Sequence, residues 1–145
     1  MSTIHFRAAK TDDVPAIQQI YDYYVHTSSC TFDYITPTVE EMKELMQRIF
    51  PTYPYFVCTM DEKVVGYAYA HPISNRLAYQ WSTELSIYIA PNYRGKGLGK
   101  ELYKILFNVL TAQHVQAVYA CITNPNPVSE RMHSDLGFKL VARWP

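Results

Sequence analysis

The sequence lacks an excess of charge of either sign. Its 145 residues carry 13 Lys and Arg against 13 Asp and Glu, which gives a formal net charge of zero at pH 7. Proteins that cover nucleic acid or an anionic membrane present a basic surface. The balance therefore predicts no nucleic-acid partner and no membrane partner, and any site for an anion must be local.

Cysteine is scarce as well. The three cysteines are widely spaced and form no CxxC pair: Cys30, Cys58 and Cys121. This pattern predicts neither a disulfide framework nor a zinc site, and it suits a reducing compartment. Four histidines also lack the spacing of metal ligands, and we assign them no role: His5, His26, His71 and His114. We therefore expect no metal.

Long hydrophobic runs are missing too. No apolar stretch approaches the ~18 residues of a membrane span, and residues 1–7 lack the basic and then apolar pattern of a signal peptide. These observations predict a soluble, cytoplasmic protein.

Apolar and aromatic residues, by contrast, make up 48% and 14% of the chain, and no linker interrupts it, so we expect one domain over residues 1–145. Periodicity predicts strands at 4–8, 55–60, 64–71, 84–89, 117–122 and 138–143. It predicts helices at 12–25, 39–49, 98–110 and 127–136, the first capped by Thr11 and the second by the pair Thr38 and Glu41. This order is typical of a three-layer α/β sandwich.

The most informative segment is a Gly-rich turn between a predicted strand and a predicted helix. It reads Arg94-Gly95-Lys96-Gly97-Leu98-Gly99-Lys100. Unpaired backbone N–H groups and the helix dipole favour a bound phosphate at such a turn. The turn lacks residues that the P-loop and the dinucleotide fingerprint require. Taken alone, it is equally compatible with an ordinary strand-to-helix connection.

The turn resembles the acetyl-CoA motif of the GNAT N-acetyltransferase superfamily, Arg/Gln-x-x-Gly-x-Gly/Ala, here Arg94-x-x-Gly97-x-Gly99. Further ordered matches cover nearly the whole chain and resemble the phosphinothricin acetyltransferase-like branch. They include Thr31-Phe32-Asp33, Tyr79-x-Trp81-x-x-Glu84-x-Ser86-Ile87-Tyr88-Ile89 and Asn126-x-x-Ser129-x-x-x-His133-x-x-x-Gly137-Phe138. The resemblance implies the GNAT acyl-CoA N-acyltransferase fold, a mixed and mostly antiparallel sheet with helices on both faces.

The same resemblance implies acetyl-CoA as co-substrate and assigns residues to it. Backbone amides of the turn hold the pyrophosphate: Gly95, Lys96, Gly97, Leu98, Gly99 and Lys100. Arg94, the first residue of the motif, belongs to the same cofactor site. The preceding strand separates from its neighbour at a bulge, and its backbone pairs with the pantetheine arm: Ile87, Tyr88 and Ile89. Asn126 matches a side chain that contacts the same arm.

For catalysis, Glu84 matches the family's general base, which the reaction needs because an amine attacks only when neutral. A strand-end Glu in a surface ion pair is the alternative. His133 matches the position that protonates the departing thiolate, and a packed structural histidine is an equally open interpretation. Phe32, Arg76 and Tyr79 match loops that shape the acceptor pocket, where Arg76 would grip a carboxylate. An exposed loop arginine without that role is the alternative for Arg76.

The resemblance implies N-acetylation of a small, amino-acid-like primary amine by a homodimeric enzyme. The family normally continues through a further strand, which appears short or missing after Gly137 and Phe138. Two alternatives stay open: a protein or peptide N-terminal acetyltransferase, and a non-catalytic acyl-CoA-binding module.

Overall fold

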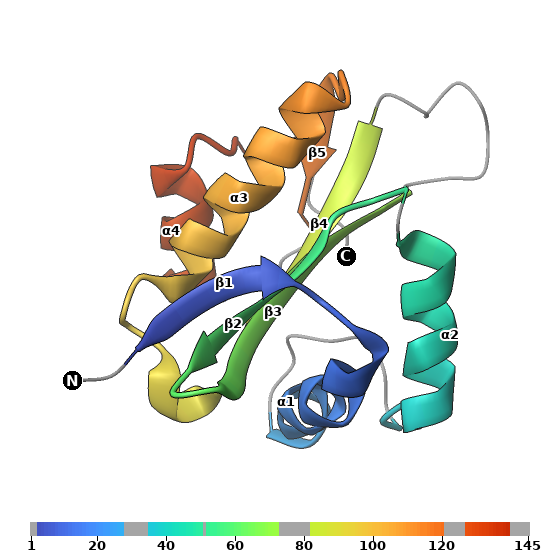
Figure 1. Cartoon of the computed structure of the whole chain (residues 1–145). Coiled ribbons are helices and arrows are strands. Elements are labelled where there is room, and N and C mark those ends of the chain that lie inside the picture. Colours follow the sequence, from blue (N-terminus) through green and yellow to red (C-terminus); the bar gives the residue numbers. More distant parts are fainter. Residues whose placement is uncertain (1–2, 28–34, 51, 73–81, 121–126, 140–145) are drawn as a thin grey trace.

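A computed structural model describes residues 3–27, 35–50, 52–72, 82–120 and 127–139, and its elements follow the predicted order (Figure 1). The strands are β1 (Ile4–Ala8), β2 (Tyr55–Met60), β3 (Lys63–Pro72), β4 (Ser82–Ile89) and β5 (Ala117–Tyr119). The α-helices are α1 (Val14–Thr27), α2 (Val39–Ile49), α3 (Leu98–Ala112) and α4 (Pro127–Asp135). Short 3-10 turns cover Thr11–Asp13 and Pro91–Tyr93.

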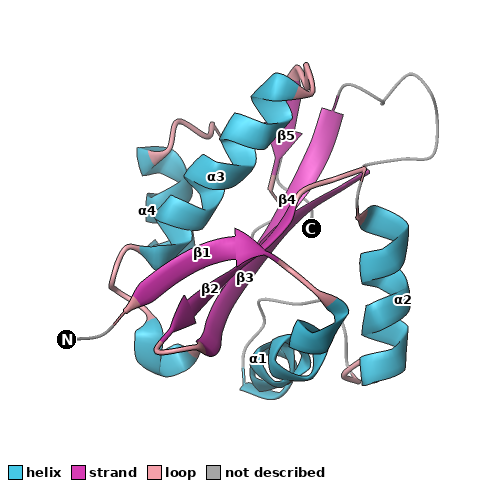
Figure 2. Ribbon diagram, viewed as in Figure 1, coloured by secondary structure: helices cyan, strands magenta, loops and turns pink. Residues whose placement is uncertain are grey.

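The strands form a five-stranded sheet in the order β1-β2-β3-β4-β5. The first four pair antiparallel, whereas β5 runs parallel to β4. Helices α1 and α2 cover one face of the sheet and α3 and α4 cover the other (Figure 2). This arrangement confirms the predicted α/β class with a mixed, mostly antiparallel sheet.

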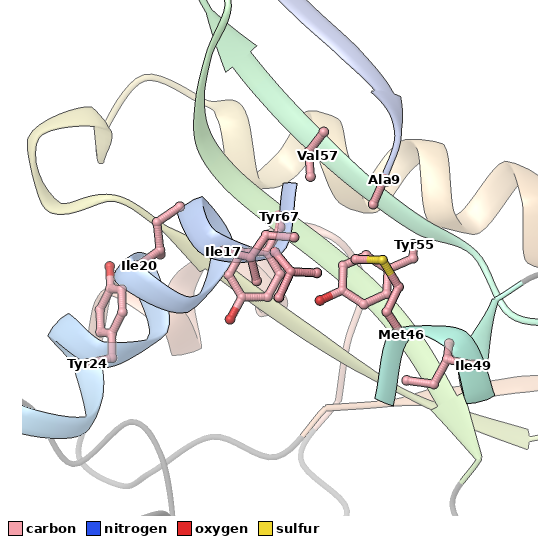
Figure 3. Close-up of a cluster of buried hydrophobic side chains, with 10 residues drawn as sticks. Ala9, Ile17, Ile20, Tyr24, Met46, Ile49, Tyr55, Val57 and Tyr67 are labelled. Atoms are coloured by element: carbon pink, nitrogen blue, oxygen red, sulfur yellow. The ribbon is translucent and has the colours of Figure 1, made fainter. Parts of the chain in front are cut away.

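Each face of the sheet has its own core. Alternation along β3 sends Tyr67 and Tyr69 toward α1 and α2, and Ala68 and Ala70 toward α3. Figure 3 shows Tyr67 and Tyr55 in one cluster with Ile17 of α1 and Met46 of α2. Every second residue of the central strands therefore faces the α1/α2 side, a point on which the site depends.

Local predictions at Thr11 and at the ends of two strands need correction. Thr11 is not the N-cap of a long helix, because the Asp13 carboxylate accepts the Lys10 N–H and a 3-10 turn forms first. The β3/β4 register runs without a shift from Gly66↔Ile89 to Pro72↔Thr83, so the predicted separation of β4 from a neighbour does not lie on that side. Strand β5 ends at Tyr119, and residues 138 and 139 lie in no strand; residues 121–122 and 140–143 lie outside the described ranges.

The capping box of α2 is confirmed. The Glu41 N–H donates to the Thr38 hydroxyl at 3.1 Å, and the Thr38 N–H donates to the Glu41 carboxylate at 3.0 Å. Two backbone donors at the helix start are thereby satisfied.

A partly buried ion pair ties β1 to the start of α1. Both terminal nitrogens of Arg7 donate to the Asp13 carboxylate at 2.8 Å, and Asp13 is 6% exposed. Burial alone would raise the pKa of Asp13, but hydrogen bonds from Arg7 and from the Lys10 N–H lower it overall.

We expect Asp13→Asn to lower the free energy of unfolding by about 2 kcal/mol at neutral pH, because charge-assisted hydrogen bonds are lost. Since folding lowers the Asp13 pKa, its contribution is complete above the unfolded value of about 4, declines below it, and is lost as the pH falls through the lower folded value. Urea unfolding of both proteins at pH 7 and pH 3 measures this. An equal difference at the two pH values would contradict the assignment.

Candidate active site

Strand β4 has an edge that β5 covers only in part. In the described part of the chain, β5 pairs with β4 only at Ser82, Thr83 and Glu84. The Ala90 N–H donates to the Val65 carbonyl on β3 at 2.8 Å. Because backbone direction alternates along a strand, the N–H and C=O groups of Leu85, Ile87 and Ile89 point away from β3.

The same alternation separates the three predicted pantetheine contacts. The backbone groups of Tyr88 point toward β3, so they belong to the β3/β4 ladder. The Ile89 carbonyl accepts a hydrogen bond from the Tyr24 hydroxyl. The open edge of β4 therefore offers the backbone N–H and C=O of Ile87 and the N–H of Ile89 to an extended ligand.

The Gly-rich turn leads this edge into α3. Gly95 and Gly97 have φ of +78° and +79°, a conformation that costs other L-residues about 1–2 kcal/mol. Gly97 is the N-cap of α3, and no side chain caps the helix there. The first N–H groups of α3 are thus directed at the turn with a partial positive charge, which fits an anion such as a pyrophosphate.

The charged side chains of the turn differ in their surroundings. Arg94 and Lys96 are exposed, and the Arg94 Nε lies 3.5 Å from the Pro91 carbonyl. Lys100, by contrast, donates to the Asp135 carboxylate on α4 at 3.2 Å. Lys100 thereby links α3 to α4, while Arg94 and Lys96 remain beside the turn.

Leu98 and Gly99 are buried and contribute to the packing of α3. A Cβ on Gly99 would lie 3.0 Å from the Met132 sulfur and 3.4 Å from Cδ1 of Ile87. The missing side chain lets α3 approach both β4 and α4. Only the backbone of Gly99 is therefore available to a ligand.

Glu84 lies at the point where β4 separates from β5. Its neighbours Leu85 and Ile87 face the core beneath α3, so Glu84, Ser86 and Tyr88 face α1 and α2. Glu84 is half-buried and pairs across the ladder with His71. No ion pair involves Glu84 among the described residues.

His133 lies on α4, on the opposite face of the sheet, and is 4% exposed. Its Nε2 and the Tyr103 hydroxyl of α3 are 2.9 Å apart, and the Tyr103 and Phe138 rings pack edge-on against the imidazole. Burial raises the pKa of the Tyr103 hydroxyl, which stays protonated. The ring of His133 is therefore held by a definite partner.

We expect Tyr103→Phe to lower the free energy of unfolding by about 1–3 kcal/mol, because it removes a buried hydrogen bond to His133. Thermal and urea unfolding of the purified variant measure this. A stability equal to that of the unmodified protein would show that this hydrogen bond contributes nothing to the fold.

Four predicted site residues lie outside the described residues: Phe32, Arg76, Tyr79 and Asn126. Two further residues escaped sequence reasoning. His71 received no role, although the period-two pattern Tyr67, Tyr69, His71 places it on the site face of β3. Tyr103 and His133 are 30 residues apart, and no local pattern indicates their contact.

Within the described ranges, no cluster of three or more potential ligands could hold a metal ion. Burial raises the pKa of the Cys58 thiol to about 11, so this cysteine is not a thiolate nucleophile at neutral pH. None of the described helices has the length and apolar content of a membrane span.

The chain matches a known family over almost its whole length. Residues 6–144 match the family model described as an acetyltransferase (GNAT) domain. The chain is 33% identical over 135 residues to phosphinothricin N-acetyltransferase of Streptomyces viridochromogenes, which covers 93% of this chain and 74% of that protein. It is 30% identical to L-methionine sulfoximine/L-methionine sulfone acetyltransferase of Salmonella typhimurium, covering 96% and 82%.

Solved structures of similar fold point to the same family. A GNAT superfamily phosphinothricin acetyltransferase from Sinorhizobium meliloti, crystallised with acetyl-CoA, superposes with a TM-score of 0.93 at 36% identity, covering 97% of this chain and 77% of that one. Ribosomal-protein-alanine N-acetyltransferase from Brucella melitensis gives a TM-score of 0.88 at 29% identity, covering 93% and 84%. The chain therefore belongs to the GNAT acetyltransferase family, in its phosphinothricin acetyltransferase-like branch, and is an acetyl-CoA-dependent acetyltransferase.

Proposed function

We propose that this chain transfers the acetyl group of acetyl-CoA to the primary amine of a small, amino-acid-like acceptor. One observation carries the proposal. The open edge of β4 runs from Glu84 past Ile87 and Ile89 and leads into the uncapped N-terminus of α3. A carboxylate, a strand edge and an anion site thus follow one another in the order that an acyl donor with a pyrophosphate needs.

In this proposal the turn and the strand hold the co-substrate. The backbone amides from Gly95 to Lys100 would bind the pyrophosphate, with Arg94 and Lys96 adding charge beside it. The backbone of Ile87 and Ile89 would pair with the pantetheine arm as an added strand does. Asn126 would contact the same arm. When bound, acetyl-CoA supplies an acetyl group activated as a thioester.

Glu84 and His133 would then act from opposite faces of the sheet. Glu84 would accept a proton from the acceptor's ammonium group, directly or through water, on the α1/α2 side. His133 would supply a proton to the departing thiolate on the α3/α4 side, with its ring held by Tyr103. The Ile87 N–H would polarise the thioester carbonyl between them.

The acceptor class rests on the relatives. Proteins 30–33% identical act on phosphinothricin and on methionine sulfoximine, both analogues of amino acids. We propose that Phe32, Arg76 and Tyr79 shape the acceptor pocket, with Arg76 on a carboxylate. We also propose a homodimer that works in the cytoplasm, where its cysteines stay reduced.

Peptide N-termini are the second candidate acceptors. The specific observation is the likeness to a ribosomal-protein-alanine N-acetyltransferase at a TM-score of 0.88. A peptide acceptor needs an open groove and makes no use of a carboxylate grip next to the reacting amine.

Thiol release from acetyl-CoA by the purified protein distinguishes these functions. The panel comprises free amino acids, phosphinothricin, methionine sulfoximine, polyamines and short peptides. We expect turnover on the amino-acid class that exceeds turnover on peptides and polyamines by at least about tenfold. Faster turnover on peptides would overturn the acceptor class. If no acceptor of the panel supports thiol release while acetyl-CoA still raises the melting temperature, the chain is a binding module.

A further inference from the structure

We propose that His71 is a second proton-accepting group of the acceptor site, which shares with Glu84 the proton that the acceptor's ammonium group gives up. The inference rests on the proposed function and extends it from one basic residue to two. It concerns a histidine to which neither sequence spacing nor the family match assigns a role.

The pairing of β3 with β4 places the two groups side by side. His71 and Glu84 are directly opposite residues of the antiparallel ladder, and both face α1 and α2. Directly opposite residues have Cβ atoms about 4.5–5.5 Å apart. The two side chains therefore share one patch of the sheet, next to the point where β5 leaves β4.

Ser86 extends the patch on the same face. Its hydroxyl oxygen lies 3.4 Å from Nε2 of His71, and the Tyr69 ring centroid lies 5.5 Å from the imidazole centroid. Two titratable groups thus neighbour His71 on this face: Glu84, its ladder partner on β4, and Tyr69 on β3. The Ser86 hydroxyl thus lies within reach of the imidazole on the face that carries Glu84.

The ring of His71 is not held as a structural histidine is. His133 is 4% exposed and has its Tyr103 partner at 2.9 Å. His71 is half-buried, and its contact with Ser86 is at the long end of the hydrogen-bond range. The end of β3 is held through the backbone of His71 and not through its ring, because the Thr83 hydroxyl donates to the His71 carbonyl at 2.7 Å. Among the described residues, the imidazole is therefore held less firmly than that of His133.

The chemistry favours such a partner. An alkyl ammonium has a pKa near ~10, a carboxylic acid near ~4 and an imidazolium near ~6.5. A neutral imidazole is thus about a hundredfold stronger base than a carboxylate. An imidazole beside Glu84 therefore gives the proton of the acceptor a second basic group to which it can pass.

The protons and bonds balance as follows. The ammonium group gives one proton to His71 or Glu84, and the freed nitrogen lone pair forms the N–C bond as the C–S bond breaks. The nitrogen then loses a second proton, the thiolate gains one, and the proton on His71 or Glu84 passes to solvent. The net products are the amide, the free thiol and one proton.

The test compares two acceptors that differ in amine basicity. One is the best free amino acid of the panel and the other is its amide, whose amine has a pKa near ~8, as at a peptide N-terminus. The amine of the free amino acid is more basic, because its carboxylate stabilises the ammonium ion. For each acceptor, kcat and KM are measured at pH 7 for the unmodified protein, H71Q, E84Q and the control H5Q, at the exposed His5 of β1.

We expect H71Q to lower kcat about tenfold for the free amino acid and about threefold or less for its amide, with KM nearly unchanged. H5Q should change neither. A purely structural role for His71 predicts equal losses for both acceptors, and that result, or no loss at all, would overturn the inference. If H71Q does not fold by circular dichroism, H71N takes its place under the same criteria. Failure of the unmodified protein to acetylate either acceptor would instead refute the proposed function.

Discussion

Glu84→Gln should lower kcat for acetyl transfer about a hundredfold or more, while KM for acetyl-CoA changes less than about threefold. General acid–base catalysis contributes about 10²–10⁴-fold, and the amide that replaces the carboxylate cannot accept a proton. The substitution keeps the shape of the side chain, so the fold should persist. Steady-state kinetics with varied acetyl-CoA at saturating acceptor measure both constants.

A matched control is available on α2. Glu44 is exposed there and is assigned no role in the site. Glu44→Gln makes the same chemical change and should leave kcat within about twofold of the unmodified protein. A loss below tenfold in Glu84→Gln, or an equal loss in the control, would remove Glu84 from the role of general base.

Gly97→Val should raise KM for acetyl-CoA about 10- to 30-fold. The φ of +79° at Gly97 is strained for a β-branched residue by more than about 1–2 kcal/mol, and 1.4 kcal/mol corresponds to tenfold in binding. Apart from its chain neighbours, no described residue comes within 4 Å of the added Cβ, so the effect comes from the backbone and not from a clash. The backbone would leave the left-handed conformation and turn the first amides of α3 away from the pyrophosphate.

Gly97→Asn separates conformation from side-chain bulk. Asn adopts the left-handed conformation more readily than other residues that carry a Cβ. KM for acetyl-CoA should therefore stay within about threefold of that of the unmodified protein. Acetyl-CoA should also raise the melting temperature of Gly97→Asn about as much as it raises that of the unmodified protein. If Val and Asn behave alike at this position, the backbone of the turn does not hold the co-substrate.

The sequence predicted those features that depend on nearby residues. The pair Thr38 and Glu41 marks the start of α2 because a capping box needs only four consecutive residues. The glycines at 95 and 97 mark the turn because few other residues tolerate its φ. The prediction that Thr11 caps the first helix was wrong, because Asp13 accepts the Lys10 N–H and pairs with Arg7.

The remaining features depend on contacts between distant segments. Periodicity shows that His71 and Glu84 each occupy a strand, but only the pairing register makes them opposite neighbours. The contact of Tyr103 with His133 requires α3 and α4 to pack closely, which Gly99 permits. A period-two or period-3.6 pattern carries no information on which strand or helix lies beside it.

The most direct test of acetyl transfer follows both products of one reaction. Purified protein is incubated with acetyl-CoA and methionine sulfoximine, and free thiol and N-acetylated acceptor are quantified by thiol titration and mass spectrometry. We predict that the two products appear in equal amounts, with the acetyl group on the α-amine. Thiol release without acetylated acceptor would identify thioester hydrolysis, and that result, or the absence of both products with every amino-acid acceptor of the panel, would contradict the proposed function.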